Sequence, residues 1–394
     1  MSRHMRSLGR LIAIALLFTA ACETPTEGPR GLAPDSPEVL ATATGPWLNV
    51  ATWNVYLGGD IAPVLGADFS NPPEVVAAAA TAWNQVQNSN MPERASAVVG
   101  RLAEEMPAVV GLQEVFRFIE LDGAFQPIVA PLDMLQLIED EISFRGLPYQ
   151  VLGVQEATSA ALPVRLDFST FQVDRWVAFT DRVVTLARND IVVSQVMQGA
   201  YQASFPLAPG IELKRGWIRV DVEHWGGTVH LINTHLEGQS LSPIQSLQAD
   251  ELLGPITSAL PGTVVVMGDL NSDAAAAPGA PSWTPTYGRL RDAGFFDAWT
   301  EARPVAGQGF TCCHDPGLTG PEGSLDERID FVLVRQPDGA GGSHLEGTAR
   351  VDLLGDEDSE QTEPSGLWPS DHAGISVELL LPPGLASTSR ASGS

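Results

Sequence analysis

The stretch that most constrains this chain is VVVMGDLN, residues 264–271. Its four apolar residues follow a Pro-Gly-Thr turn and predict a buried strand, which stops abruptly at a Gly-Asp pair. Asp269 and Asn271 are therefore expected at the exit of a strand. In layered α/β proteins, binding and catalytic groups collect there, because the sheet fixes their backbone while the loop leaves them open to a ligand. A single Asp-x-Asn also closes ordinary turns, so the argument depends on repetition.

The same pattern of a strand-like run with a polar group at its end recurs at five other places. The groups are Asn54 in LNVATWN, Glu114 in VVGLQE, His235 in VHLINTH, Asp330 in RIDFVLV, and the pair Asp371 and His372 in SDH before GISVELL. Taken together and in this order, the six blocks resemble the endonuclease/exonuclease/phosphatase superfamily. That superfamily includes DNase I, abasic-site endonucleases, inositol polyphosphate 5-phosphatases and bacterial sphingomyelinases. The resemblance covers residues 47–381.

The resemblance implies a four-layer α/β sandwich of the α+β type, in which two mixed β-sheets pack face to face with helices outside. An apolar stripe at helical spacing predicts a helix over residues 132–144. Proline at a first-turn position opens predicted helices over residues 92–106 and 242–260. The predicted strands are 48–53, 108–112, 149–154, 183–188, 217–224, 228–233, 264–267, one around Asp330 and one after His372. Hairpins mixed with helical crossovers argue against a purely parallel sheet.

The resemblance also implies a metal ion. Magnesium takes oxygen ligands and needs few protein groups, because water and substrate phosphate complete its shell. Glu114 matches the principal ligand of Mg²⁺ or Mn²⁺, with Asn54 and Asp269 near it and Asp371 as a further ligand. Such an ion would neutralise phosphate charge and polarise phosphorus, or lower the pKa of a bound water.

A water molecule that attacks phosphorus needs a proton acceptor, and a histidine titrates near neutrality. His372 matches the family's base, and Asp330 matches the carboxylate that orients it. His235 matches the group that contacts the scissile phosphate, and Asn271 can add an amide donor. Asp269 could instead orient the attacking water, and the sequence leaves that division of roles open.

Other basic groups are expected to be structural. Lys214 and Arg215 precede a strand and could face phosphate, but we expect a solvated strand end. His224 and His230 fall in or beside predicted strands, where we expect surface groups or hydrogen-bonded core groups.

The N-terminus predicts export. Arginines precede an apolar run, residues 11–18, which is too short to span a bilayer, and small residues follow it. We expect residues 1–21 to be a signal peptide and Cys22 to be the acylated cysteine of a lipoprotein, although Thr19 stands where lipoproteins usually carry leucine. The protein would then lie in the cell envelope, anchored to a membrane.

The domain organisation follows from composition and from the spread of the six blocks. Residues 22–46 are rich in Pro, Thr, Glu, Gly and Ala and predict a flexible tether. Because the blocks extend from Asn54 to His372, we expect one domain over residues 47–381, followed by a disordered tail, residues 382–394. We expect a monomer.

The charge balance disfavours long nucleic acid as the principal ligand. Removing residues 1–21 leaves 19 of the 22 basic residues against 48 acidic ones. A protein that neutralises many phosphates needs clusters of Lys and Arg. We therefore expect a small or lipid phosphoester as substrate. An extracellular nuclease and a catalytically silent binding protein on the same scaffold are the alternatives.

The adjacent cysteines Cys312 and Cys313 allow three states. Outside the cytoplasm a vicinal disulfide can form, although it spans less than the usual distance between bonded cysteines. Free thiols are the second state. Zinc binding with His314 ranks below both, because the spacing matches no common structural zinc pattern.

Overall fold

The computed structural model describes residues 47–167, 169–170, 172–303, 308–336 and 349–381. The predicted signal peptide, Cys22, the tether and the C-terminal tail lie outside the described residues. Among the described helices, none is both long enough and apolar enough to cross a membrane.

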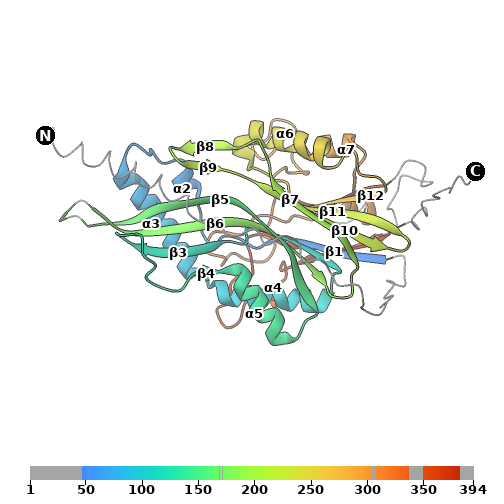
Figure 1. Ribbon diagram of the computed structural model, residues 1–394, viewed down its shortest axis with the longest axis horizontal. Coiled ribbons are helices and arrows are strands. Elements are labelled where there is room, and N and C mark those ends of the chain that lie inside the picture. Colours follow the sequence, from blue (N-terminus) through green and yellow to red (C-terminus); the bar gives the residue numbers. More distant parts are fainter. Residues whose placement is uncertain (1–46, 168, 171, 304–307, 337–348, 382–394) are drawn as a thin grey trace, which may run out of the picture.

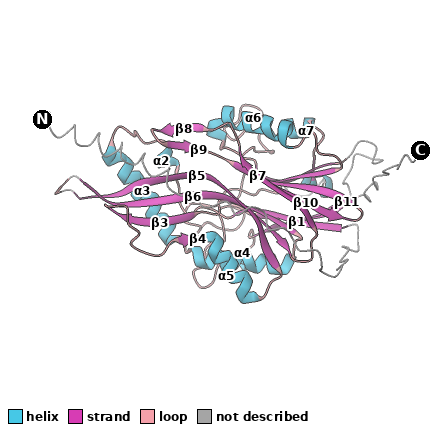
Figure 2. Cartoon of the chain, in the orientation of Figure 1, coloured by secondary structure: helices cyan, strands magenta, loops and turns pink. Residues whose placement is uncertain are grey.

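Two large mixed sheets make up the centre of the molecule, and helices lie outside them (Figure 1, Figure 2). The first sheet has the order β15-β16-β1-β2-β6-β3-β4, with β5 paired to β6. Its strands are β1 (Trp47–Asn54), β2 (Val109–Gln113), β3 (Arg117–Asp122), β4 (Leu132–Asp133), β5 (Tyr149–Asp167), β6 (Gln172–Arg188), β15 (Ala349–Leu354) and β16 (Gly374–Leu380). In this sheet β1 and β2 are parallel, whereas the other pairs are antiparallel.

The second sheet has the order β13-β14-β12-β11-β10-β7. Its strands are β7 (Val193–Ala200), β10 (Gly216–His224), β11 (Gly227–His235), β12 (Thr263–Asp269), β13 (Phe296–Asp297) and β14 (Asp330–Arg335). Here β11 and β12 are parallel, and the other pairs are antiparallel. The short strands β8 (Phe205–Ala208) and β9 (Ile211–Leu213) pair with each other.

Helices cover the outer faces of both sheets. The α-helices are α2 (Ala62–Leu65), α3 (Pro72–Asn88), α4 (Met91–Glu105), α5 (Met134–Arg145), α6 (Ser242–Glu251), α7 (Thr286–Asp292) and α8 (Ala298–Ala302). Shorter turns of helix are η2 (Gln239–Leu241), η3 (Leu252–Ile256) and η4 (Asp358–Glu360). In Figure 1, α4 and α5 lie along one side and α6 and α7 along the other, so the molecule has four layers. The predicted fold class is confirmed.

The innermost core lies between the two sheets. It is built from β-branched side chains on the facing surfaces of both, including Val50, Val109, Val220, Val265 and Val377, each fully buried. Such side chains pack well on a pleated surface. Burying strands on both faces explains why the sequence shows continuous apolar runs such as VVVM rather than strict alternation.

Strand register aligns three polar residues in one row at the edge of the second sheet. His235 at the end of β11 pairs with Asp269 at the end of β12, and Asp269 pairs with Asp330 at the start of β14. Gly268 permits the close approach of β11 and β12, because a Cβ atom there would lie 1.9 Å from the carbonyl oxygen of Thr234. Its φ of +142° also favours glycine.

Two local expectations differ from the structure. The helix predicted over residues 242–260 ends as α6 at Glu251 and continues only as the π-helical turn η3. Pro255 lies in that turn and has no N–H to continue an α-helical ladder. The strands predicted at 149–154 and 183–188 are the base of a hairpin that is much longer, since β5 and β6 pair as far as Asp167 and Gln172.

Candidate active site

The predicted polar groups meet where the two sheets adjoin at their ends. Asn54 at the end of β1 donates from Nδ2 to Asp269 Oδ2 of the other sheet, at 3.0 Å. His372, just before β16, bonds through Nδ1 to Asp330 Oδ2 at 2.8 Å. These two hydrogen bonds join the first sheet to the second, so the site exists only when both sheets are in place.

The loop that carries His372 is fastened to the end of β1. The indole of Trp53 donates to the carbonyl oxygen of His372 at 2.9 Å, and the hydroxyl of Ser370 donates to the carbonyl oxygen of Asn54 at 2.6 Å. A serine, a tryptophan and main-chain groups thereby fix a loop that carries two ionisable side chains. Rigid placement of this kind is what a catalytic constellation requires.

A second group of contacts surrounds His235. Its Nε2 lies 3.4 Å from Asp269 Oδ2 and 3.1 Å from Asn271 Nδ2. The main-chain N–H of Asn271, a residue with a φ of +49°, donates to Asp269 Oδ1 at 2.8 Å. The GDLN turn therefore holds its own aspartate and brings the asparagine to the histidine.

Glu114 and Asp371 lie beside this cluster. Glu114 follows β2 in a left-handed conformation, with a φ of +54°, and its Oε2 accepts from the main-chain N–H of Leu57 at 2.9 Å. Asp371 Oδ1 lies 4.0 Å from His372 Nε2. The negative charge of Glu114 helps to raise the pKa of Asp371, which places the two carboxylates in the same part of the site.

Two carboxyl groups of the site have strongly perturbed pKa values. Burial, reinforced by the negative charge of Asp330, raises the pKa of Asp269 to about 7. Burial also raises the pKa of Asp371 to about 7, against the attraction of His372 and with the repulsion of Glu114 adding to it. Perturbation of this size is typical of functional sites.

The two histidines are shifted in opposite directions. Burial lowers the pKa of His235 well below its usual value, and the positive charges of Arg215 and His372 lower it further. Burial also opposes a charge on His372, but Asp330, Asp371 and Asp269 outweigh it and hold the pKa of His372 well above its usual value. These surroundings thus favour the neutral form of His235 and the protonated form of His372.

The donor set fits a hard divalent cation. Glu114, Asp371 and the amide oxygen of Asn54 supply oxygen atoms, which Mg²⁺ and Mn²⁺ prefer. Burial and the nearby carboxylate of Glu114 raise the pKa of Asp371 to about 7. A bound cation would favour the ionised form and lower this pKa. Among the described residues, two groups bring one ligand atom each within 4.8 Å of one another, namely Asp269, Asp330 and His372, and Cys312, Cys313 and His372.

Arg215 corrects an expectation. We predicted a solvated strand end for Lys214 and Arg215, and Lys214 is indeed exposed and paired with Glu212. The side chain of Arg215, in contrast, is only 17 % exposed and donates to His235 Nδ1 at 3.0 Å. The expectation of a solvated position is wrong for Arg215, because its guanidinium pairs with buried acids in the site.

Those acids are Asp181 and Glu237, which the sequence did not single out. Arg215 contacts Asp181 Oδ2 at 3.2 Å and Glu237 Oε1 at 3.1 Å. Burial raises the pKa of Asp181 to about 7, against the attraction of Arg215 and with repulsion from Glu114. Arg215 can only donate, and so can the amide nitrogen of Asn271, so Nδ1 and Nε2 of His235 each face a donor. The only signal in the sequence was an arginine just before a strand.

Arg94 is a second arginine that the sequence did not reveal. It is fully buried in α4, and its guanidinium donates to the carbonyl oxygens of Val55, Tyr56 and Pro369 and to the hydroxyl of Ser89. It thereby joins the loop after β1 to the loop that carries Asp371. Its charge also acts on Asp371.

Cys312 and Cys313 form a vicinal disulfide, the state that we ranked first. Cys312 is buried and bridges to the main chain of His372. His314 stacks on Trp368, with ring centroids 4.3 Å apart, and bonds to the Ser324 hydroxyl at 2.7 Å. Main-chain contacts from Cys312 to His372 and from the N–H of His314 to the carbonyl oxygen of Asp371 make this loop a support of the SDH segment.

The other two histidines of the described residues, His224 and His230, lie in the second sheet, as expected. His230 is buried and bonds through Nδ1 to Asp221 Oδ1 at 2.8 Å. His224 is also buried, at the end of β10.

A fold of two mixed sheets, with carboxylates, histidines and amides gathered at one end, defines a class of metal-dependent phosphoester hydrolases. Comparison with known proteins identifies the family. The model of the Endonuclease/Exonuclease/phosphatase family matches residues 51–372, and the chain belongs to this family. Its members are generally metal-dependent phosphoester hydrolases. A search of curated proteins found no significant match.

Several solved structures are similar to this chain at low sequence identity. An endonuclease/exonuclease/phosphatase from Beutenbergia cavernae is 19% identical with a TM-score of 0.50, and the match covers 85% of this chain and 72% of that one. A family protein from Leptotrichia buccalis is 13% identical with a TM-score of 0.49, covering 84% and 99%. Truncated TDP2 of Caenorhabditis elegans is 18% identical with a TM-score of 0.46, covering 84% and 97%.

Proposed function

We propose that the protein is an exported, metal-dependent phosphoester hydrolase that acts on a small or lipid phosphoester. The observation that carries the proposal is the buried cluster at the junction of the sheets. There Asn54 and His372 from one sheet bond to Asp269 and Asp330 of the other, beside the Glu114 and Asp371 pair.

The metal ion in this proposal is Mg²⁺ or Mn²⁺, held by Glu114, Asp371 and Asn54. When bound, it would neutralise phosphate charge and activate a water molecule or polarise phosphorus. Asn54 is already fixed for that role, because its Oδ1 accepts from the main-chain N–H of Tyr56 at 3.0 Å while its Nδ2 donates to Asp269. Main-chain and side-chain bonds of this kind orient a ligand before the ion arrives.

The phosphate would meet donors from three side chains. His372 is an imidazolium oriented by Asp330, and it can stabilise negative charge that develops on phosphoryl oxygens. Burial favours the neutral form of His235, and Asn271 places its amide nitrogen 3.1 Å from Nε2 of that histidine. Preorganised donors in a site that excludes water stabilise a transition state far more than they would in water.

The charge environment favours Asp269 as the proton acceptor. Resemblance pointed to His372 as the base and left Asp269 as the group that orients water. A histidine that already carries its proton cannot accept another, whereas a carboxylate whose pKa lies near 7 is matched to the task. We therefore assign proton acceptance to Asp269 and phosphate binding to the His372–Asp330 pair.

A panel of substrates tests the proposal. We expect metal-dependent hydrolysis of bis(p-nitrophenyl) phosphate, and faster turnover of sphingomyelin or inositol phosphates than of duplex DNA. With 48 acidic residues in the chain, binding should not depend on neutralising many phosphates. Activity should therefore change by less than about tenfold between roughly 50 and 200 mM salt. Efficient cleavage of duplex DNA with a steep salt slope, and no lipid hydrolysis, would identify a nuclease instead.

A further inference from the structure

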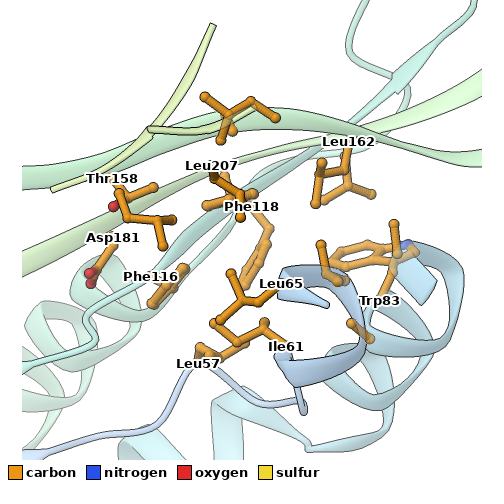
Figure 3. A pocket seen from close by; sticks show the side chains of 18 of the residues that line it. Leu57, Ile61, Leu65, Trp83, Phe116, Phe118, Thr158, Leu162, Asp181 and Leu207 are labelled. Atoms are coloured by element: carbon orange, nitrogen blue, oxygen red, sulfur yellow. The ribbon is translucent and has the colours of Figure 1, made fainter. Parts of the chain in front are cut away.

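An apolar cavity of about 120 Å³ lies next to the site, between the helices α2 and α3 on one side and the β5–β6 hairpin on the other (Figure 3). A water molecule needs only about 10–15 Å³, so the cavity is large enough for several heavy atoms. Aromatic side chains surround it, and Figure 3 shows Trp83, Phe116 and Phe118 facing the hollow.

Regular structure builds the apolar walls. Alternate residues of β5 face the cavity, namely Ala160, Leu162 and Val164, as the period of a strand requires. The opposite wall is α3, which contributes the small residues Ala79 and Ala82. Small side chains on a helix leave room that larger ones would fill.

The polar lining residues gather at the end of the cavity that adjoins the site. Asp181, Arg215 and Glu237 line it there, and Arg215 reaches His235 Nδ1 at 3.0 Å. Leu57 lines the cavity with its side chain while its main-chain N–H donates to Glu114 at 2.9 Å. Cavity and site therefore share a wall.

We infer that this cavity binds an alkyl chain of the substrate, so that the phosphoester is amphiphilic and its phosphate lies in the site while its chain extends between α3 and the β5–β6 hairpin. The inference rests on the proposed function. It narrows the substrate class from small or lipid phosphoesters to those that carry an apolar chain.

The lining distinguishes an alkyl chain from a nucleobase. Aromatic rings could stack on a base, but a buried base also needs hydrogen-bond partners for its edges, and unpaired polar groups are unfavourable in such surroundings. Apart from Asp181, Arg215 and Glu237, the described lining offers the indole N–H of Trp83 and the hydroxyl of Thr158, which already donates to the carbonyl oxygen of Lys214 at 3.0 Å. At the shared wall, Asp181 Oδ1 and Glu237 Oε2 are buried and have no hydrogen-bond partner. As acceptors they can pair with a hydroxyl or ammonium group of an amphiphile, but not with its phosphate oxygens.

Chain length is the first experimental variable. Alkyl p-nitrophenyl phosphates with chains of one, four and eight carbons would be hydrolysed by the full-length protein below their micelle concentrations. Each methylene group that leaves water multiplies affinity by about fourfold. We expect kcat/KM for the octyl ester to exceed that for the methyl ester by at least about a hundredfold.

Filling the cavity is the second variable. Ala160→Phe would place a ring in the cavity, whereas Ala161→Phe, on the same strand but outside the lining, is the matched control. Ala160→Phe should lower kcat/KM for the octyl ester to the value for the methyl ester. The kcat/KM for the methyl ester should stay unchanged, which also shows that the variant is folded. Ala82→Leu narrows the cavity from the opposite wall and should have the same selective effect.

Binding is measured separately from turnover. Alkylphosphonates of the same chain lengths, titrated by calorimetry, should bind more tightly as the chain lengthens, with a negative heat-capacity change. Hydrolysis that is indifferent to chain length would overturn the cavity assignment and leave the hydrolase proposal standing. Binding that depends on chain length, without hydrolysis of any ester, would support the cavity assignment and contradict the hydrolase proposal. Neither binding nor hydrolysis would contradict both.

Discussion

Asp269 and Asp371 show how the environment of single residues shapes this site. Both are carboxyl groups removed from water near other acids, and both have a pKa raised to about 7. A carboxyl group in this state is sensitive to any cation that approaches, because the cation favours its ionised form. The same surroundings keep His372 protonated. The roles proposed for these residues can therefore be separated by metal and by pH.

Glu114→Gln and His372→Ala should fail in different ways. Losing the carboxylate should weaken the binding of Mg²⁺ or Mn²⁺ by at least about tenfold, and added metal should partly restore activity. Losing the imidazolium should lower kcat by about a hundredfold or more at every metal concentration. Activity titrations with each metal measure the difference. Glu104→Gln, at an exposed position in α4, is the control and should behave as the wild type. Identical titrations for the two site variants would contradict the assigned roles.

Asp269→Asn should remove the acidic limb of the pH–rate profile. Asp269 accepts a proton only when it is ionised, so the wild-type rate should fall as pH decreases through the pKa of Asp269. That pKa is about 7 without metal, and a bound metal ion would lower it, so the fall should lie at or below about pH 7. The asparagine variant should be about a thousandfold slower, with no such limb. On the alkaline side the rate should decline as His372 loses its proton. Profiles of kcat/KM for the wild type, Asp269→Asn and His372→Ala test both signs. An acidic limb that survives in Asp269→Asn and disappears in His372→Ala would return the base to His372.

Sequence predicted the polar cluster because its members follow recognisable strands. Asn54, His235 and Asp269 each close an apolar run, and strand register then brings such ends together. Asp181 gave no such signal, because it lies within the continuous strand β6. Arg215 was misjudged, because the partners that bury it are 34 and 22 residues away and belong to other elements.

At the scale of elements, the close contact of β11 with β12 depends on a single glycine. Gly268→Ala should destabilise the protein by about 3 kcal/mol or more, since a Cβ atom would overlap the Thr234 carbonyl and the backbone φ is unfavourable for alanine. Gly288→Ala in α7 is the matched control, because a Cβ atom there meets nothing within 4 Å. It should stabilise the protein by about 0.5–1 kcal/mol. Urea unfolding of both variants measures the effect, and equal midpoints would show that the contact tolerates a methyl group.

Predictions of elements succeeded where local signals were strong. Proline at a first-turn position, with Glu93 beside it, predicted the helix that the structure shows as α4, Met91–Glu105. The tip of the β5–β6 hairpin and the Ala-rich helix α3 were not predicted. Many side chains of the hairpin are only partly buried, so its polar and apolar residues mix, and alanine gives little contrast between the faces of a helix.

For the whole molecule, the membrane anchor is the most direct prediction. Cys22→Ser should release the protein from membranes into the soluble fraction, while leaving the specific activity of the released protein on a soluble ester unchanged. Fractionation and intact mass of the N-terminal peptide measure this. If the wild-type protein is already soluble and carries no added mass at Cys22, the prediction of lipidation is wrong and only the prediction of secretion remains.

The pairing of β1 with β16 joins the earliest described strand to the latest, with Thr52 opposite Ile375. Asn54 ends β1 and His372 lies just before β16, yet the ribosome adds them to the chain more than three hundred residues apart. A nascent chain therefore contains most of the site residues long before the complete site can form. Hydrolysis can begin only after β16 has been made and has returned to β1, so a truncated product of translation is inert whatever compartment it reaches.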